Sequence, residues 1–221
     1  AHEVGNPLTS ISSLVQVIQR TTSDKFTIEK LDLIKSQINR ISKIIRELVD
    51  FSRKSPYQVQ LTDVNSNLKE AVEIVRVGKK SKRIDFATIM DENLPLLPLV
   101  PDQIQQVFIN MLINAVDAID TRINTADKTE PPVKGKISIA TYSDTKNLYI
   151  AIEDNGHGIK SEHQAKIFEP FFTTKKIGEG TGLGLWISYG IVKSFQGDIK
   201  VDSTVGKGTS FKIVLPLYND Y

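Results

Sequence analysis

Apolar residues repeat at helical spacing through the first 54 residues of the chain. They fall at positions 4, 8, 11, 15 and 18, and again at 31, 34, 38, 41, 45 and 48. Alternating steps of three and four residues place such side chains on one face of an α-helix. The pattern predicts two helices joined by the polar segment TTSDK, which is short enough for an antiparallel hairpin.

Further apolar residues widen this stripe beyond what one partner helix can cover: Leu14, Val17, Leu33, Ile44 and Phe51. Two hairpins would bury the stripe by forming a four-helix bundle. We therefore expect a homodimer through residues 1–54. The alternative is that the rest of the chain covers the stripe.

The pattern changes at about residue 60. Helical periodicity predicts helices at 65–77, 102–120 and 182–195, and β-rich or alternating runs predict strands at 84–89, 136–142, 147–154, 197–203 and 209–216. Helices interleaved with hairpins indicate an α+β domain at 60–221, with one mixed sheet under a helical layer. We expect a linker at 55–59 and, because residues 122–135 are polar with paired prolines, a surface loop there.

The composition of the chain excludes several classes of function. The chain has 28 Lys and Arg against 26 Asp and Glu and no Cys, which excludes disulfides and thiolate chemistry and gives no basic excess for nucleic acid. No apolar run approaches the ~20 residues of a membrane span. The chain opens AHEVGNPLTS, without Met or a leader, so we interpret it as a fragment. We expect a cytoplasmic location with no membrane contact within this fragment, and a membrane anchor upstream in the full-length protein stays an open alternative.

Two glycine-rich segments, EDNGHGI at 153–159 and GEGTGLGL at 178–185, are candidates for phosphate or nucleotide contact. Neither fits a Walker A motif or the dinucleotide fingerprint, and the signatures of protein kinases are missing. Taken singly, the first is equally typical of a hairpin turn and the second of a flexible loop.

The order of several signals along the chain is more specific. Asn110 and Asn114 share one helix face, and they are followed by DNGHG at 154–158, IFEPFFTTK at 167–175, GTGLGL at 180–185 and GTSF at 208–211. This set resembles the N, G1, F, G2 and terminal glycine boxes of the sensor histidine kinase ATP-binding domain, which shares a superfamily with Hsp90, type II topoisomerases and MutL. The resemblance covers about residues 60–217 and implies a Bergerat-type ATP-binding sandwich.

The resemblance also implies roles for single residues. Asp154 would accept a hydrogen bond from the adenine amine, with help from Thr209, and Asn114 would be an oxygen ligand for Mg²⁺. Glycines of the G2 box would form a lid over the phosphates, and Lys175 or Lys176 would neutralise phosphate charge. The implied ATP-binding set is Asn110, Asn114, Asp154, Gly156, Gly158, Ile159, Phe168, Thr174, Lys175, Gly180, Thr181, Gly182, Leu183, Gly184, Leu185 and Thr209.

The residue at position 110 distinguishes this chain from the resembling ATPases of the superfamily. In the resembling ATPases, a glutamate one turn before the Mg²⁺ asparagine activates water. This chain has Asn110 there, and an amide cannot act as a general base. We therefore expect the nucleophile to come from outside the ATP pocket.

The nucleophile candidate is His2, in the segment HEVGNPL. This segment resembles the phosphoacceptor box of histidine kinases, with Asn rather than Thr four residues after the histidine and Gly5 in place of the usual basic residue. By helical angle, His2 points away from the apolar seam and shares a face with Asn6, while Glu3 can accept the ring N–H. His157 and His163 are interpreted as exposed polar residues.

We thus interpret the chain as the catalytic core of a two-component sensor histidine kinase. ATP with Mg²⁺ would phosphorylate His2, and the phosphoryl group would pass to an aspartate of a response-regulator receiver domain. Glu3 and Asn6 also match the family's phosphatase pattern. The alternatives are an ATPase of the chaperone or topoisomerase type, and a nucleotide-binding scaffold.

Overall fold

The computed structural model describes residues 2–52, 58–125, 134–175 and 180–217, without the side chains of 2–6, 46–48 and 50–52. The chain divides into two compact units. One contains the N-terminal helices together with Glu169–Gly184, and the other contains Tyr57–Phe168 and Leu185–Tyr221. Within the described residues, no helix is long and apolar enough to cross a membrane.

The N-terminal helices form the hairpin that the sequence predicts. Helices α1 (His2–Thr21) and α2 (Lys25–Ser52) are joined by a short turn in which the Asp24 carboxylate accepts a 2.9 Å hydrogen bond from the Thr27 N–H. This contact caps the start of α2. Val15, Leu31 and Ile38 form the buried core of the hairpin, and Leu8 packs against them.

Much of the predicted apolar stripe remains exposed in the single chain. Leu14 is 63% exposed and Val17 is 57% exposed. The other exposed apolar residues of the hairpin are Ile11, Ile18, Phe26, Leu33, Ile34 and Ile41. An exposed stripe of this extent on a helical hairpin is typical of an interaction surface.

The second unit is built on a five-stranded mixed sheet with the order β2-β4-β5-β7-β6. Its strands are β2 (Ile84–Met90), β4 (Gly135–Ser143), β5 (Asn147–Asp154), β6 (Asp198–Thr204) and β7 (Gly208–Pro216). β2 runs parallel to β4, and the other neighbours are antiparallel. A two-stranded sheet pairs β1 (Gln60–Thr62) with β3 (Leu97–Leu99).

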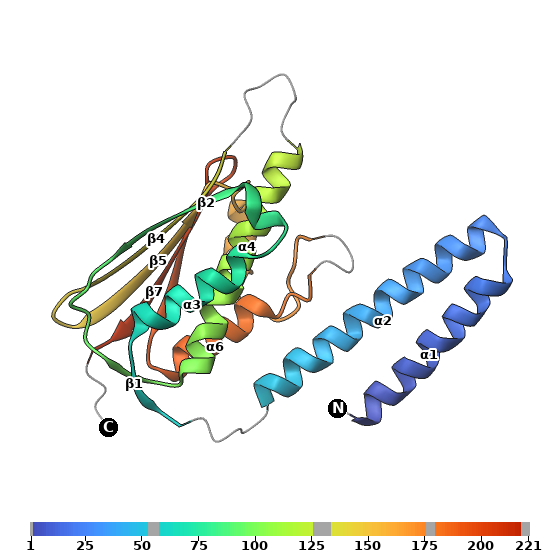
Figure 1. Ribbon diagram of the computed structural model, residues 1–221, viewed down its shortest axis with the longest axis horizontal. Helices are drawn as coiled ribbons and strands as arrows, with labels where there is room; N and C mark the ends of the chain where they lie inside the picture. The colour runs from blue at the N-terminus through green and yellow to red at the C-terminus, as the bar shows by residue number, and fades with distance from the viewer. Residues whose placement is uncertain (1, 53–57, 126–133, 176–179, 218–221) are drawn as a thin grey trace. The chain divides into compact units, whose positions relative to one another are not determined.

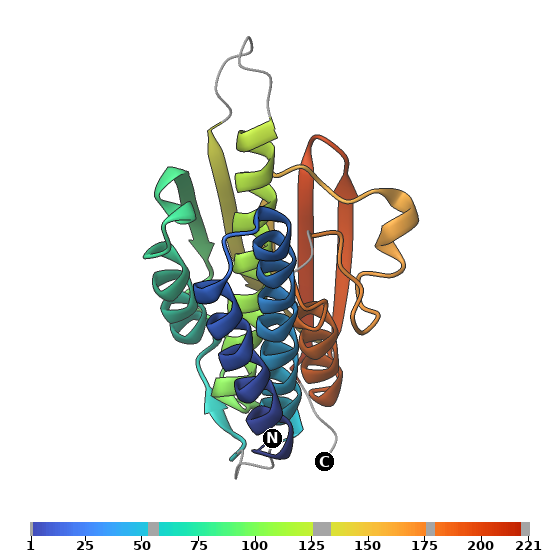
Figure 2. The same cartoon turned by 90° about the vertical axis from the view of Figure 1, so that its right-hand side faces the viewer.

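Helices α3 (Val64–Arg76), α4 (Pro101–Thr125) and α6 (Gly184–Ser194) cover one face of this sheet (Figures 1 and 2). The core lies between the two layers. Its fully buried side chains include Leu68, Ile104, Phe108, Met111, Leu112, Ile119, Ile137, Ile139, Leu148, Ile150 and Ile152. The α+β prediction, with a mixed sheet under helices, is confirmed.

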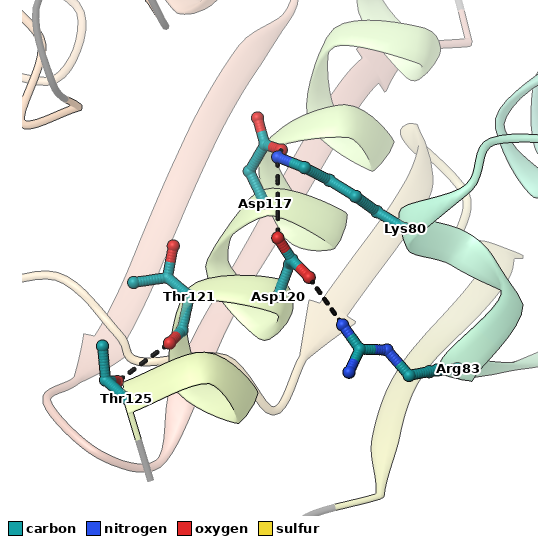
Figure 3. A network of polar contacts seen from close by, with 6 residues as sticks. All are labelled: Lys80, Arg83, Asp117, Asp120, Thr121 and Thr125. Carbon is teal, nitrogen blue, oxygen red and sulfur yellow. Dashed lines mark hydrogen bonds and ion pairs between the residues drawn. The ribbon is translucent and has the colours of Figure 1, made fainter.

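A short helical turn, η1 (Lys80–Arg83), is tied to the side of α4 by ion pairs (Figure 3). Lys80 Nζ lies 2.7 Å from Asp117 Oδ1, and Arg83 Nη2 lies 3.1 Å from Asp120 Oδ1. The basic side chains are more than half exposed, so each pair contributes at most about 1 kcal/mol. These ion pairs hold η1 beside α4 and contribute little to the free energy of unfolding.

Most of the predicted helices and strands differ from the observed ones by a residue or more at one or both ends. The helix predicted at 102–120 runs from Pro101 to Thr125, so the first residues of the predicted loop at 122–135 are helical, and Arg122 in the added turn donates to the Asn155 backbone oxygen. The helix predicted from residue 182 begins at Gly184, because Gly182 has a φ of +75°, which no α-helix contains. The strand predicted at 136–142 includes Gly135.

Short elements escaped the sequence analysis. β1, β3, η1 and α5 (Ser161–Gln164) each have four residues or fewer, too few to show a period. Most of the predicted loop, at 126–133, and residues 55–57 of the predicted linker lie outside the described residues.

Candidate functional site

The ends of three adjacent strands carry a row of polar side chains. Asp154 at the end of β5 pairs in register with Thr209 of β7, which pairs with Ser203 of β6. Asp154 and Thr209 have the same strand parity as the buried residues Ile152 and Phe211, so they lie on the face that the helices cover. A shallow groove at this edge of the sheet is lined by Asp154, Ser203 and Thr209 and also by Glu153, Asp202 and Ser210 of the opposite face.

Asp154 is a carboxylate held in a largely desolvated place. Burial raises the pKa of Asp154 to about 6, while backbone N–H groups of Gly156 and Thr209 and the charge of His157 act in the opposite direction. The Gly156 N–H donates to Asp154 Oδ1 over 2.7 Å. A buried carboxylate with remaining acceptor capacity suits an uncharged hydrogen-bond donor such as an amine.

The glycines that follow Asp154 allow close approach of the backbone. A Cβ at Gly156 would lie 2.6 Å from Ala118 Cβ of α4, and a Cβ at Gly158 would overlap the Thr204 backbone. The His157 N–H donates to Ala118 O over 3.3 Å, and the His157 side chain is exposed as predicted. A residue without a side chain is therefore needed at position 156 for the turn to lie on α4, and at position 158 for it to lie against the end of β6.

Arg122 of α4 clamps the same turn and was not predicted. Its Nη1 donates to Asn155 O over 2.6 Å and lies 3.5 Å from Gly156 O. Asn155 fixes the other side of the turn, because its Oδ1 accepts from Lys136 N at 2.8 Å. The turn after Asp154 is therefore held both by α4 and by β4. Arg122 falls within the loop predicted at 122–135, so nothing in the sequence indicated this role.

Ser203 is a second residue that the sequence analysis missed. Its Oγ accepts a 2.8 Å hydrogen bond from the Ile159 N–H, donates to Gly208 O over 2.9 Å and lies 3.0 Å from Thr209 Oγ1. Ile159 is thus held to β6 through its backbone. The alternation of residues along the predicted strand places Ser203 on the same face of the sheet as Thr209. This is the one feature of the sequence that could have identified Ser203.

The two asparagines predicted on one face of α4 are both half-buried there. Asn110 Nδ2 donates to Ser188 Oγ of α6 over 3.3 Å. Asn114 lies one turn further along α4, one turn before Ala118, on which the Asp154 turn packs. Nearby, Phe168 packs on Tyr189 of α6, with ring centroids 5.0 Å apart, and Leu185 is half-buried in the first turn of α6.

The residues of the F and G2 boxes, within Glu169–Gly184, belong to the other compact unit. Their local geometry brings the two ends of this segment together. A Cβ at Gly182 would overlap the Phe171 backbone, and a Cβ at Gly180 would lie 2.8 Å from Thr173 Oγ1. Phe171 has a φ of +66°, an uncommon conformation for a residue with a side chain.

The remaining predicted residues of this segment are also placed locally. Thr174 is exposed, Lys175 is half-buried, and Thr181 Oγ1 accepts from the N–H of buried Leu183 over 3.3 Å. Gly184 is the first residue of α6. Residues 176–179, which include Lys176, lie outside the described part of the chain.

The predicted phosphoacceptor segment lies at the start of α1. His2 is the first residue of this helix, and Glu3 and Asn6 lie in its first two turns. The side chains of these three residues lie outside the described part, so the predicted orientation of His2 stays a prediction.

Two family models match the chain. The His Kinase A (phospho-acceptor) domain matches residues 1–56, and the histidine kinase-, DNA gyrase B-, and HSP90-like ATPase matches residues 99–219. The chain belongs to the sensor histidine kinase family. The resemblance drawn from the ordered boxes is thereby confirmed, while the exact domain boundaries stay a prediction.

Curated sensor histidine kinases are similar over nearly the whole chain. The signal transduction histidine-protein kinase AtoS of Escherichia coli (strain K12) is 41% identical over 219 residues, which are 98% of this chain and 34% of AtoS. The sensor kinase CckA of Brucella abortus (strain 2308) is 37% identical over 227 residues, covering 98% of this chain and 23% of CckA. The chain thus spans about a third or less of these relatives.

A solved structure of the sensor histidine kinase ThkA in complex with the response regulator protein TrrA has a similar fold. Its TM-score is 0.66 at 24% identity, and the match covers 99% of this chain and 60% of that chain. Both the helical hairpin and the ATPase-like unit of this histidine kinase chain therefore have counterparts in known structures.

Proposed function

We propose that this chain binds ATP beside Asp154 and Thr209 and transfers the γ-phosphoryl group to His2. The observation that carries the proposal is the Asp154–Thr209 pair at the strand ends, next to a glycine turn packed on the helix of Asn110 and Asn114. The match to an ATPase family supports ATP as the nucleotide. The two buried acceptors suit the exocyclic amine of adenine.

Mg²⁺ would be held by the nucleotide phosphates and by the amide oxygen of Asn114. Among the described residues no group of three or more His, Cys, Asp or Glu side chains could hold a metal ion. A protein that supplies few ligands is typical of Mg²⁺ that arrives with nucleotide phosphates. In the Glu169–Gly184 segment, the N–H groups of Gly180, Gly182 and Gly184 would face the phosphates, with Lys175 as a counter-charge.

The transfer itself would use the neutral imidazole of His2 as the nucleophile. A ring nitrogen forms the new N–P bond, the bond from γ-phosphorus to the bridging oxygen breaks, and ADP leaves. Glu3 would accept the hydrogen bond from the other ring nitrogen, which carries the proton. Asn110 supports this assignment, since it offers no general base for attack by water at this site.

The phosphoryl group would then pass to an aspartate of a response regulator, the class of partner present with ThkA in its solved complex. Glu3 and Asn6, which match the family's phosphatase pattern, would support a second, phosphatase activity. The exposed apolar residues of α1 and α2 support a homodimer through residues 1–54, in which two hairpins form a four-helix bundle. In the same proposal, residues 55–59 link the hairpin to the ATP-binding domain, and the catalysis takes place in the cytoplasm.

One labelling experiment tests the proposal against an ATPase and a scaffold. The chain is incubated with γ-labelled ATP and Mg²⁺, and the protein-bound label is treated with acid or alkali. Acid-labile, alkali-stable label that is absent from His2→Gln and present in the control His163→Gln would support histidine phosphorylation. Steady phosphate release without bound label would indicate an ATPase, and nucleotide binding without turnover would indicate a scaffold.

A further inference from the structure

The contacts of Ser203 determine where the hydroxyl proton of Thr209 points. Ser203 Oγ has three neighbours at hydrogen-bond distance: Ile159 N at 2.8 Å, Gly208 O at 2.9 Å and Thr209 Oγ1 at 3.0 Å. The first can only donate and the second can only accept. The third is a hydroxyl, which can do either.

A serine hydroxyl has one proton and two lone pairs, so only one assignment makes all three contacts hydrogen bonds. Ser203 donates its proton to Gly208 O, which leaves it as the acceptor toward the other two groups. The Thr209 hydroxyl must then donate to Ser203 Oγ. With its proton committed to Ser203, Thr209 Oγ1 presents only lone pairs to any other group.

Other contacts fix this arrangement in place. Thr209 is 5% exposed and Gly208 is buried, so their conformational freedom is small. Gln164 Nε2 donates to Ser203 O over 2.9 Å and to Ile159 O over 3.1 Å. These two hydrogen bonds hold the short helix α5 against the backbone of Ser203 and Ile159. Ser203 is thus held at its backbone and at its side chain.

The base end of the site would then present two acceptors and no donor. Asp154 and Thr209 are register partners on neighbouring strands and lie on the same face of the sheet. The 6-amino group of adenine offers two hydrogens to such a pair. The 6-oxo group of hypoxanthine or guanine offers only lone pairs, which two acceptors disfavour.

We propose that Ser203 is a positioning residue which holds the Thr209 hydroxyl as an acceptor and thereby sets the preference for 6-aminopurine over 6-oxopurine nucleotides. This proposal rests on the proposed binding of adenine nucleotides at Asp154 and Thr209. Ser203 need not touch the base. Loss of its hydroxyl would free the Thr209 proton, which could then donate to a 6-oxo group.

The test compares the dissociation constants of ADP and IDP, which differ in the group at position 6 of the base and in the proton on N1, and which support no phosphoryl transfer. Titration calorimetry on the full chain with Mg²⁺ gives both constants. We expect Ser203→Ala to reduce the ADP-over-IDP preference about tenfold, the size of one reoriented hydrogen bond. Ser203→Thr keeps the hydroxyl and should retain the wild-type preference.

A double-mutant cycle with Thr209→Val separates this role from a structural one. If Ser203 acts through Thr209, Ser203→Ala changes the preference in the wild-type background and not in the Thr209→Val background. The matched control is Ser210→Ala, which removes a hydroxyl from the next residue of β7, one that donates to Glu153 rather than to Thr209.

Several outcomes would overturn the proposal. An equal loss of ADP and IDP affinity in Ser203→Ala would show a structural role only, and so would an undiminished effect in the Thr209→Val background. If Ser203→Ala does not fold, Ser203→Cys keeps the side-chain volume with a far weaker hydrogen-bonding group, and an unchanged preference there would be equally decisive. If the wild-type chain binds neither nucleotide, the proposed function fails as well.

Discussion

Arg122 and Asn155 join the end of α4 to the turn that carries Asp154, through a 2.6 Å hydrogen bond from the guanidinium to the backbone oxygen. Arg122→Met removes a charged donor from two backbone carbonyls. We expect it to lower the free energy of unfolding by about 1.5–3 kcal/mol and to weaken ATP binding. Denaturant unfolding and nucleotide titration measure the two effects.

The matched control for Arg122 is Arg83→Met. Arg83 also bridges to α4, but its partner is Asp120 and its side chain is 56% exposed (Figure 3). An exposed ion pair contributes at most about 1 kcal/mol, and ATP binding should not change. Equal effects of the two substitutions on nucleotide affinity would contradict the clamp.

The second prediction concerns pH and nucleotide affinity. Burial raises the pKa of Asp154 to about 6, so the carboxylate takes up a proton as the pH falls below that value. We expect the preference for ATP over ITP to fall roughly tenfold between pH 7.5 and pH 5, since the protonated acid is a poorer acceptor for the adenine amine. Because the two nucleotides have the same phosphates, their ratio cancels phosphate titration. A constant ratio across this range would exclude Asp154 as the acceptor.

The third prediction concerns pH and stability. The native state protonates Asp154 below about pH 6 and the unfolded state only below its ordinary pKa of 3.8. Between these values the native state binds more protons, so stability falls as the pH rises, by up to about 3 kcal/mol, and the full cost is present above pH 6. Asp154→Asn should therefore stabilise the nucleotide-free chain more at pH 8 than at pH 5. Unfolding curves at both values give this difference, and a gain independent of pH would refute it.

The fourth prediction concerns Asn114. If its amide oxygen binds Mg²⁺ together with the phosphates, Asn114→Ala should weaken ATP binding at least about tenfold in Mg²⁺ and much less in EDTA. Asn124→Ala, at an exposed position near the end of the same helix, is the control. Loss of affinity to the same extent with and without Mg²⁺ would assign Asn114 a structural role instead.

The fifth prediction concerns the apolar stripe of the hairpin. Leu14 is 63% exposed on α1, and Leu14→Lys should convert a dimer into a monomer without unfolding the ATPase-like unit. Val77→Lys places the same charge at a residue that is 82% exposed in the other unit and should leave the dimer intact. Sedimentation velocity distinguishes the two. A wild-type chain that is monomeric at high concentration would contradict the proposed bundle.

The sequence predicted most of the fold because long periodic runs dominate it. The helices and the five strands of the main sheet were recognised, since their buried faces repeat over seven residues or more. The glycine boxes were recognisable as well. At Gly156, Gly158 and Gly182 a side chain would overlap backbone or a neighbouring helix, so these positions require glycine and the motif is visible in the sequence.

The residues that support the site were not predictable in the same way. Arg122 acts on a turn 33 residues later, and Ser203 acts on Ile159, 44 residues earlier. Neither contact leaves a local pattern, because each depends on how strands and helices far apart in the sequence meet. Arginine and serine are also common residues, so their identity alone does not mark a position as part of a site.

The register of β7 has a consequence for how such a site can change. Asp154, Thr209 and Ser203 meet because three strands are paired in one alignment, and that alignment is fixed by the buried residues further along the same strands. A shift of β7 by one residue would turn Thr209 to the opposite face of the sheet. In the proposed site, the choice of nucleotide base would therefore depend on the strand register that the hydrophobic core fixes.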